Sequence, residues 1–117
     1  MTREIKFRAW AVASKKMFEL DEDWEFVNGK LRQLPNTILM QFTGLYDKNG
    51  NEIFEGDILK PIDGVMKLNR LVEFMDGAFC YHIRETRRSG GYIPIGKHRA
   101  ILFEILGNIY ENPELLK

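Results

Sequence analysis

Cys80 and His82 have residue types and a spacing that could do chemistry. They stand two apart on a predicted strand, so both side chains project from one face and could share a metal ion or act as nucleophile and base. A zinc site needs three or four protein ligands, and the sequence has no second cysteine and only one other histidine, His98. Strand neighbours at i and i+2 also stand side by side, so the thiol is not aimed at the imidazole. We expect Cys80 to be buried as a small hydrophobic residue and His82 to be half exposed, with no metal site and no catalytic pair.

Asp47, Asn49 and Asn51 alternate like the first ligands of an EF-hand calcium loop. That loop needs glycine at its sixth position and glutamate at its twelfth, but counting from Asp47 places Glu52 and Ile58 there. The flanking helices of an EF-hand are not predicted either. A turn in which Asp47 and Asn49 bond nearby backbone groups explains the same residues. The sequence therefore predicts a structural turn here, and no metal or other cofactor.

Glu55 and Asp57 flank Gly56 and could be taken for the acid and base of a hydrolase. Such a pair needs a cleft and unequal environments, and the sequence indicates neither. A Gly-Asp step into an apolar strand is also how many small SH3-like barrels begin, with the acid bonding backbone amides at the strand corner; this is an analogy of fold. We expect no catalytic residues, no enzymatic activity and no small-molecule substrate.

The most strongly basic segment covers residues 84–99 and is expected to be an exposed loop. One acid, Glu85, is set against five basic residues, Arg84, Arg87, Arg88, Lys97 and Arg99. With Gly90 and Gly91 for flexibility and Tyr92 for stacking, the segment resembles a finger that contacts phosphates of nucleic acid. Five such contacts predict that log K falls against log salt with a slope of roughly −4.

An acidic run of similar charge precedes it in the chain and comprises Glu19, Asp21, Glu22, Asp23 and Glu25. Opposite patches on one chain can meet within the fold or across subunits. A homo-oligomer is therefore the first prediction for this protein, and binding of nucleic acid through residues 84–99 is the alternative.

Composition sets the size and class of the molecule. The 117 residues include 17 basic and 17 acidic side chains, so the formal net charge is zero, and 44% are hydrophobic. These values describe one compact domain or two very small ones, and they exclude a strongly basic nucleic-acid binder. No apolar run approaches the ~20 residues that span a bilayer, and the N-terminus lacks the apolar core of a signal peptide. With a single cysteine, the sequence predicts a cytoplasmic protein without a membrane partner.

The elements that position these groups are predicted to be strands. Asn28-Gly29, Asn49-Gly50 and Asp76-Gly77 are pairs of the kind that two-residue hairpin turns require. Alternation over residues 4–9 places Ile5, Phe7 and Ala9 on one face and the charged residues, Arg8 among them, on the other, and Trp10 is expected to cover an edge or an interface. Further strands are expected at residues 17–20, 24–27, 30–34, 38–42, 57–60, 71–75, 78–83 and 100–106.

The predicted fold is mainly β. Residues 1–37 form an N-terminal meander of hairpins, and residues 38–117 form a small SH3-like or curled barrel of about four or five strands. The two regions are either separate or one continuous domain. Asn112-Pro113-Glu114 has the pattern of a helix start, so a short helical turn is expected at the C-terminus.

Three stretches, at residues 3–10, 40–59 and 105–116, resemble in that order the YopX family of bacteriophage and prophage proteins, and the match runs essentially end to end. The resemblance implies a small, mostly β, self-associating protein of the bacterial host cytoplasm, encoded by a phage or prophage. It brings no established activity and no catalytic residues. The motif positions to which we give structural roles are Gly44, Asp47, Asn49, Gly50, Gly56, Asp57, Gly107, Asn108, Asn112 and Pro113. We therefore expect an accessory protein that assembles or binds partners.

Overall fold

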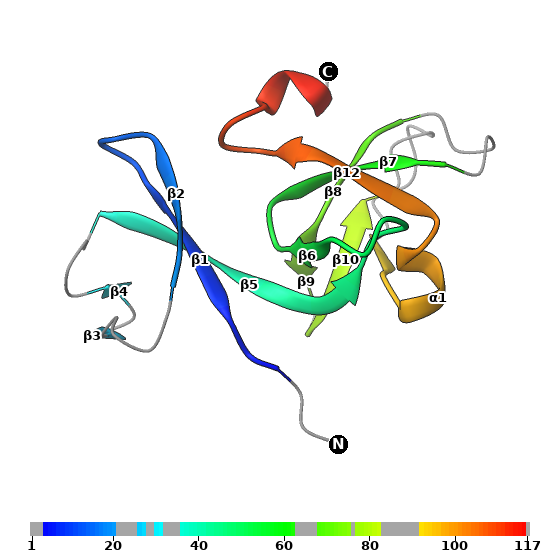
Figure 1. Cartoon of the computed structure of the whole chain (residues 1–117), viewed down its shortest axis with the longest axis horizontal. Coiled ribbons are helices and arrows are strands. Elements are labelled where there is room, and N and C mark those ends of the chain that lie inside the picture. Colours follow the sequence, from blue (N-terminus) through cyan, green and yellow to red (C-terminus); the bar gives the residue numbers. More distant parts are fainter. Residues whose placement is uncertain are drawn as a thin grey trace.

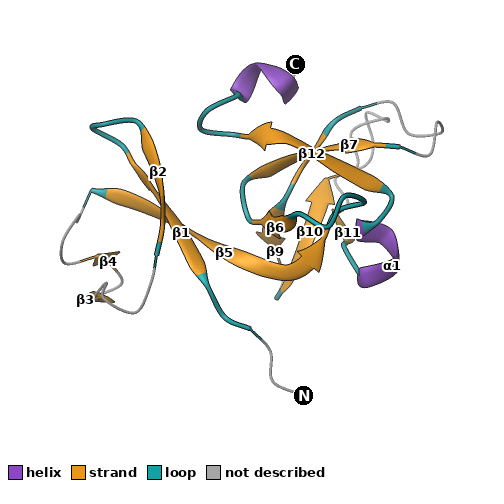
Figure 2. Cartoon of the chain, viewed as in Figure 1, coloured by secondary structure: helices purple, strands orange, loops and turns teal. Residues whose placement is uncertain are grey.

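The computed structural model describes residues 4–20, 26–27, 30–31, 36–62, 68–75, 77–82 and 92–116. The fold is mainly β, as predicted, and Figure 2 shows how little of it is helical. The described elements are β1 (Phe7–Ala11), β2 (Lys16–Glu19), β3 (Phe26–Val27), β4 (Lys30–Leu31), β5 (Thr37–Tyr46), β6 (Glu52–Phe54), β7 (Asp57–Pro61), β8 (Arg70–Leu71), β9 (Glu73–Met75), β10 (Ala78–His82), β11 (Tyr92–Pro94), α1 (Lys97–Ala100), β12 (Phe103–Asn108) and the 3-10 helix η1 (Pro113–Leu116). None of the helices among these residues is long and apolar enough to cross a membrane.

The N-terminal part is built from hairpins. β1 and β2 pair antiparallel, and the turn between them closes with Lys15 in the left-handed region at φ 56°, its N–H donating to the Ala11 carbonyl at 2.8 Å. β3 and β4 pair antiparallel, with Phe26 opposite Leu31, while the predicted turn at residues 28–29 lies outside the described residues. The predicted pairing of strands is therefore confirmed in both cases.

β5 links the two parts of the molecule because it changes partner along its length. Its first half pairs with β1, and its second half, from Phe42 on, pairs with β6 with an irregularity in that pairing between Phe42 and Leu45. Gly44 sits in that irregularity at φ 84°, a conformation that bends a strand and favours glycine. In Figure 1, β5 runs from the β1–β2 pair across to the curled part. The predicted division at residue 37 coincides with the beginning of this strand and stays a prediction.

The C-terminal part is the predicted curled sheet. Three strands in the order β12-β7-β8 and three in the order β11-β10-β9 curl with the end of β5 and β6 around one core. The buried side chains of that core are Ile53, Leu59, Val72, Tyr81, Ile95, Ala100 and Phe103. The predicted pairing of the strands on either side of residues 76–77 is confirmed, with Met75 opposite Ala78, and the C-terminal helical turn is confirmed as η1.

Strand β1 differs from its prediction. It begins at Phe7, and Ile5 is 67% exposed, because the described pairing of β1 with β5 ends at Phe7 and Gln41 and Ile5 lies beyond it. Arg8 does not face solvent as the alternation predicted, because the turn before β7 covers that face of β1 and supplies Asp57 as a partner.

Three predictions for the C-terminal part were also wrong in part. The segment 84–99 is not one loop, since β11 and α1 lie inside it, and the predicted strand at 100–106 begins only at Phe103. Arg99 and Ala100 both donate their N–H to the Gly96 carbonyl, so the chain enters the last strand through a helical turn that buries Ala100. The run predicted at 71–75 breaks at Val72, and Phe74 is 50% exposed.

Candidate functional site

The Glu55-Gly56-Asp57 turn forms the junction between the two parts of the molecule. Asp57 is buried, and its Oδ2 accepts a hydrogen bond from the Phe54 N–H at 2.8 Å, the strand-corner role expected of it. Its Oδ1 accepts from Arg8 Nη2 at 2.7 Å, and the Arg8 guanidinium lies 4.8 Å from the centre of the Phe54 ring. This ion pair, unforeseen in the sequence, connects β1 to the corner of β7.

Burial raises the pKa of Asp57, and the Arg8 charge and the Phe54 N–H oppose that rise without reversing it. The ionised carboxylate is therefore costly in this environment, and Arg8 offsets part of the cost. Glu55, the other carboxylate considered as half of an acid–base pair, is only partly buried, and its Oε1 accepts from the Gln41 N–H at 3.2 Å. Both carboxylates thus have local structural partners.

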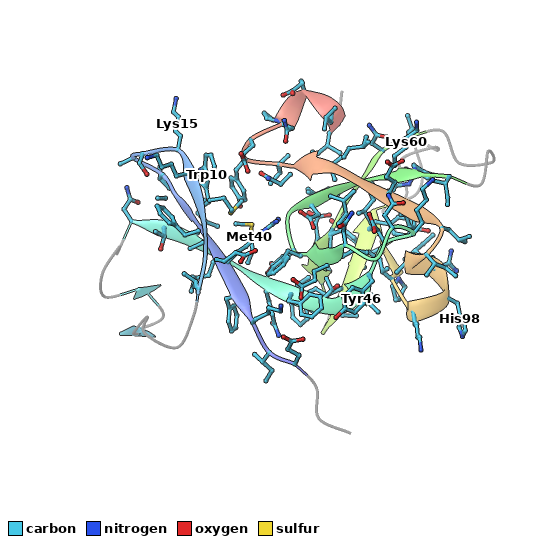
Figure 3. The ribbon with its side chains drawn as sticks, viewed as in Figure 1. Trp10, Lys15, Met40, Tyr46, Lys60 and His98 are labelled. Carbon is cyan, nitrogen blue, oxygen red and sulfur yellow. The ribbon has the colours of Figure 1, made fainter. Side chains whose placement is uncertain are left out.

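Gly56 has a backbone conformation that few other residues adopt. Its φ is 89°, and a Cβ placed on it would lie 2.9 Å from the Met40 sulfur, at the centre of the molecule in Figure 3. The Gly56 N–H donates to the Val72 carbonyl, and its own carbonyl accepts from the Ile109 N–H, each at 2.9 Å. Strands β5, β8 and β12 are therefore brought together at this glycine.

Asp47 occupies the turn that resembled a calcium loop. Its Oδ1 accepts from the N–H groups of Asn49 and Asn51 at 2.9 Å, and its Oδ2 accepts from the Ile105 N–H at 3.0 Å. Burial by itself raises the pKa of Asp47, but these three backbone donors outweigh it and hold the pKa below its usual value. The carboxylate oxygens hold the turn against β12. Within the described ranges, no three His, Cys, Asp or Glu side chains gather as a metal ion would need.

Gly107, Asn108 and Asn112 form a second structural turn at the end of β12. A Cβ on Gly107 would lie 2.3 Å from Asn112 Oδ1, so any larger residue there would displace the Asn112 side chain. Asn108 Oδ1 accepts from the N–H groups of Tyr110 and Glu111, and the Asn112 Oδ1 accepts from the Asn108 N–H at 3.3 Å. Pro113 then begins η1. These contacts direct the chain back across the turn at Gly56.

The remaining predicted site residues are only partly placed. Cys80 is buried, as expected of a small hydrophobic residue, whereas the His82 side chain lies outside the described atoms. Of the acidic run, the structure describes Glu19 at the end of β2. Of the site residues in the basic segment 84–99, it describes Tyr92 in β11 and Lys97 and Arg99 in α1. Outside the described residues lie Asp21, Glu22, Asp23, Glu25, Arg84, Arg87 and Arg88.

The exposed surface around α1 is basic and apolar at once. Lys97, His98 and Arg99 are consecutive and exposed, and Figure 3 shows the His98 side chain at the outer side of α1. Arg99 Nη1 donates to the Tyr81 hydroxyl at 3.3 Å. A hollow of about 330 Å³ beside the helix is lined by Tyr46, Ile101 and Lys97 together with Gly44 and Leu45. The sequence named these cations but gave no sign of the apolar hollow, which requires β5 and α1 to meet.

A second hollow, a groove of about 340 Å³, lies between β5 and the β8–β9 segment. Its rim carries Ile38, Phe74 and Met75, which are 37%, 50% and 39% exposed. Tyr110 forms part of one wall and stacks on Trp10 with ring centres 5.7 Å apart, so Trp10 is a buried junction residue. Burial raises the pKa of Tyr110 and the charge of Glu55 raises it further, against the Arg8 charge.

The chain matches a known family and two solved structures. The model of the family described as YopX protein matches residues 6–117. A crystal structure of protein EF1440 from Enterococcus faecalis is 28% identical, covers 99% of this chain and 100% of that chain, and has a TM-score of 0.68. A crystal structure of protein YopX from Bacillus subtilis is 19% identical, covers 96% of this chain and 98% of that chain, and has a TM-score of 0.61. This second likeness shows the fold alone. A search of curated proteins finds no match.

Proposed function

Because the chain belongs to the YopX family, we propose that it is an accessory protein encoded by a phage or prophage and acting in the cytoplasm of the bacterial host. Its work in this proposal is non-enzymatic: it binds partners and assembles as a homo-oligomer. The reading frames next to its gene test the first part, since phage structural or replication genes should flank it. A gene that lies among unrelated housekeeping genes would count against a phage origin.

One observation carries the proposal of self-association. Tyr46, Ile101 and Leu102 are 45%, 54% and 39% exposed, and they surround α1 rather than being scattered singly. Exposed apolar side chains of this size are unfavourable in water, and contact with a second copy would bury them. The opposite charges of residues 84–99 and of the acidic run would then orient the copies.

Light scattering of the full chain tests this surface. The wild-type mass should lie well above 13.7 kDa, the mass of one chain. Ile101→Asp should lower that mass without unfolding the protein, because the side chain lies mostly outside the core. Lys60→Asp is the matched control, since Lys60 is exposed on β7, away from α1 in Figure 3. Equal masses for the two variants and the wild type would show that the surface around α1 does not mediate self-association.

The same surface favours a second candidate function, the binding of nucleic acid. Lys97, His98 and Arg99 present consecutive cationic or titratable groups, and Tyr46 and Tyr92 are exposed aromatic rings suited to stacking. Titration with DNA and with RNA at low and moderate salt tests it. Binding that weakens steeply with salt and is reduced in Lys97→Gln, but not in Lys60→Gln, would support this function, and absence of binding at low salt would exclude it.

A further inference from the structure

Strand β5 presents a backbone edge to the groove that no other described strand pairs with. Alternate residues of a strand direct their N–H and C=O groups to opposite sides. Phe42 donates to the Lys6 carbonyl, toward β1, and Gln41 bonds Glu55 on the other side. Leu39 shares the orientation of Gln41, so its N–H and C=O face the groove, and among the described residues they have no hydrogen-bond partner.

Strand β9 presents a second such edge to the same groove. Met75 and Glu73 pair with Ala78 and Cys80 of β10, so Phe74 directs its N–H and C=O away from β10. Two residues earlier, Val72 uses that same side to bond Gly56 and Asp57. The corresponding groups of Phe74 have no hydrogen-bond partner within the described part of the chain.

The turn at residues 55–57 shows how far apart these two edges are. Glu55 bonds Gln41 of β5 on one side, and Gly56 and Asp57 bond Val72 on the other, so one segment fills the space between the edges. Neighbouring strands lie about 5 Å apart, so the edges are separated by about 10 Å at this level. Beyond the turn, Leu39 and Phe74 line the groove. We call the space between them the strand slot.

The lining of the slot specifies the charge of its occupant. Its charged side chains are two carboxylates, Glu55 and Glu73, and its described lining contains no lysine or arginine. Arg8 Nη2 donates to the backbone carbonyl of Glu55 at 3.2 Å, but its charge is paired with the Asp57 carboxylate. Apolar side chains at the rim, Phe74 and Met75, would cover the alternate side chains of an inserted strand.

We propose that an extended segment of a partner protein, with basic and apolar side chains at alternate positions, adds as a β-strand in the slot between β5 and β9. This inference rests on the proposed binding function and names one of its partners by chemistry. A strand donated by a second copy fits less well. Every described strand of this chain already has one edge paired, and it could therefore bond only one side of the slot.

A random peptide library displayed against the immobilised full chain tests the proposal. Selected peptides should place Lys or Arg at alternate positions, and their binding should slow hydrogen exchange at the Leu39 and Phe74 amides. Methylating alternate backbone nitrogens of a selected peptide should weaken binding about tenfold or more, because it removes backbone donors. This control leaves the protein unchanged, so folding cannot explain the loss.

Variants of the protein separate backbone from side-chain contacts. Phe74→Pro removes the groove-facing N–H but no bond to β10, whereas Phe74→Ala keeps that N–H and removes the ring. Phe74→Pro should weaken binding more than Phe74→Ala, and Glu73→Lys should also weaken it. The proposal of strand addition is refuted if the library yields no binder, or if the binders leave the Leu39 and Phe74 amides unprotected from hydrogen exchange.

The outcomes also separate this inference from the proposed function. If the protein is a multimer but selects no peptide, the strand slot is refuted and the proposed self-association stands. If it is a monomer that binds such peptides, the homo-oligomer is refuted and the strand slot stands. If the two amides are protected without peptide and lose that protection on dilution, a second copy occupies the slot, and the assignment to a partner protein is wrong.

Discussion

The Arg8–Asp57 pair is the residue-level contact on which the junction depends most. Replacing Arg8 with leucine leaves a buried carboxylate without its counter-charge, which should lower the free energy of unfolding by roughly 3 kcal/mol in urea titrations. Lys60→Ala, on the same strand as Asp57 but exposed, should change it by less than about 0.5 kcal/mol. Adding Asp57→Leu to Arg8→Leu should recover part of the loss. Equal effects of Arg8→Leu and Lys60→Ala would show that the pair is dispensable.

Asp47 should make stability depend on pH. Its pKa is lowered in the folded protein, so its contribution is present above the unfolded value of about 3.9 and is lost as the pH falls through the folded value. Asp47→Asn replaces one acceptor by an NH₂ group that cannot accept from Ile105. The variant should be less stable by about 1–3 kcal/mol at neutral pH, and the difference should shrink on acidification. A difference that does not vary with pH would contradict this.

At this scale the sequence predicted some roles and missed others. Asp57 at the strand corner and Asp47 in a turn followed from residue type and position, because the bonds to Phe54, Asn49 and Asn51 involve backbone groups close in the chain. The bond from the Ile105 N–H to Asp47 spans 58 residues and was not predicted. Arg8 could not be predicted in the same way, because alternation gives the face of a strand but not what covers it. Its partner lies 49 residues further along the chain.

Two glycines allow the elements around the junction to be tested with a matched pair. Gly77→Ala, at φ 80° with open space around the site, should cost about 1 kcal/mol from backbone strain alone. Gly56→Ala adds a contact with the Met40 sulfur to the same strain and should cost about 2–3 kcal/mol. Met40→Ala should cost less in the Gly56→Ala background than in the wild type, because it opens a cavity in both but relieves the contact with the new Cβ only in the first. Thermal unfolding compares the wild type with Gly77→Ala, Gly56→Ala, Met40→Ala and the double variant. An equal loss of stability in Gly77→Ala and Gly56→Ala would refute the close approach at Gly56.

Elements with local turn signals were the predictable ones. The pairing of β3 with β4 and of β9 with β10 was predictable from Asn28-Gly29 and Asp76-Gly77, because a turn signal of this kind lies in two adjacent residues of the sequence. Helix α1 and the break at Val72 were missed, since a short apolar run is compatible with strand or helix and only tertiary contacts decide between them. The groove was missed for the same reason, because its walls come from segments far apart in the chain.

For the whole molecule, salt should distinguish the two proposed kinds of contact. Assembly through the exposed apolar side chains around α1 is weakly screened, so the oligomer mass should persist as ionic strength rises. Binding of nucleic acid should weaken steeply over the same range. Sedimentation velocity measures the first and fluorescence titration the second. An oligomer that dissociates at high salt would point to the opposite charges of residues 84–99 and the acidic run.

The claim on which this account of function rests is that the protein works through contact with copies of itself and with other proteins. Sedimentation equilibrium of the full chain over a range of concentrations tests it most directly. The account predicts a mass that is a multiple of 13.7 kDa and that is maintained or rises with concentration. A mass of 13.7 kDa at every concentration would contradict it.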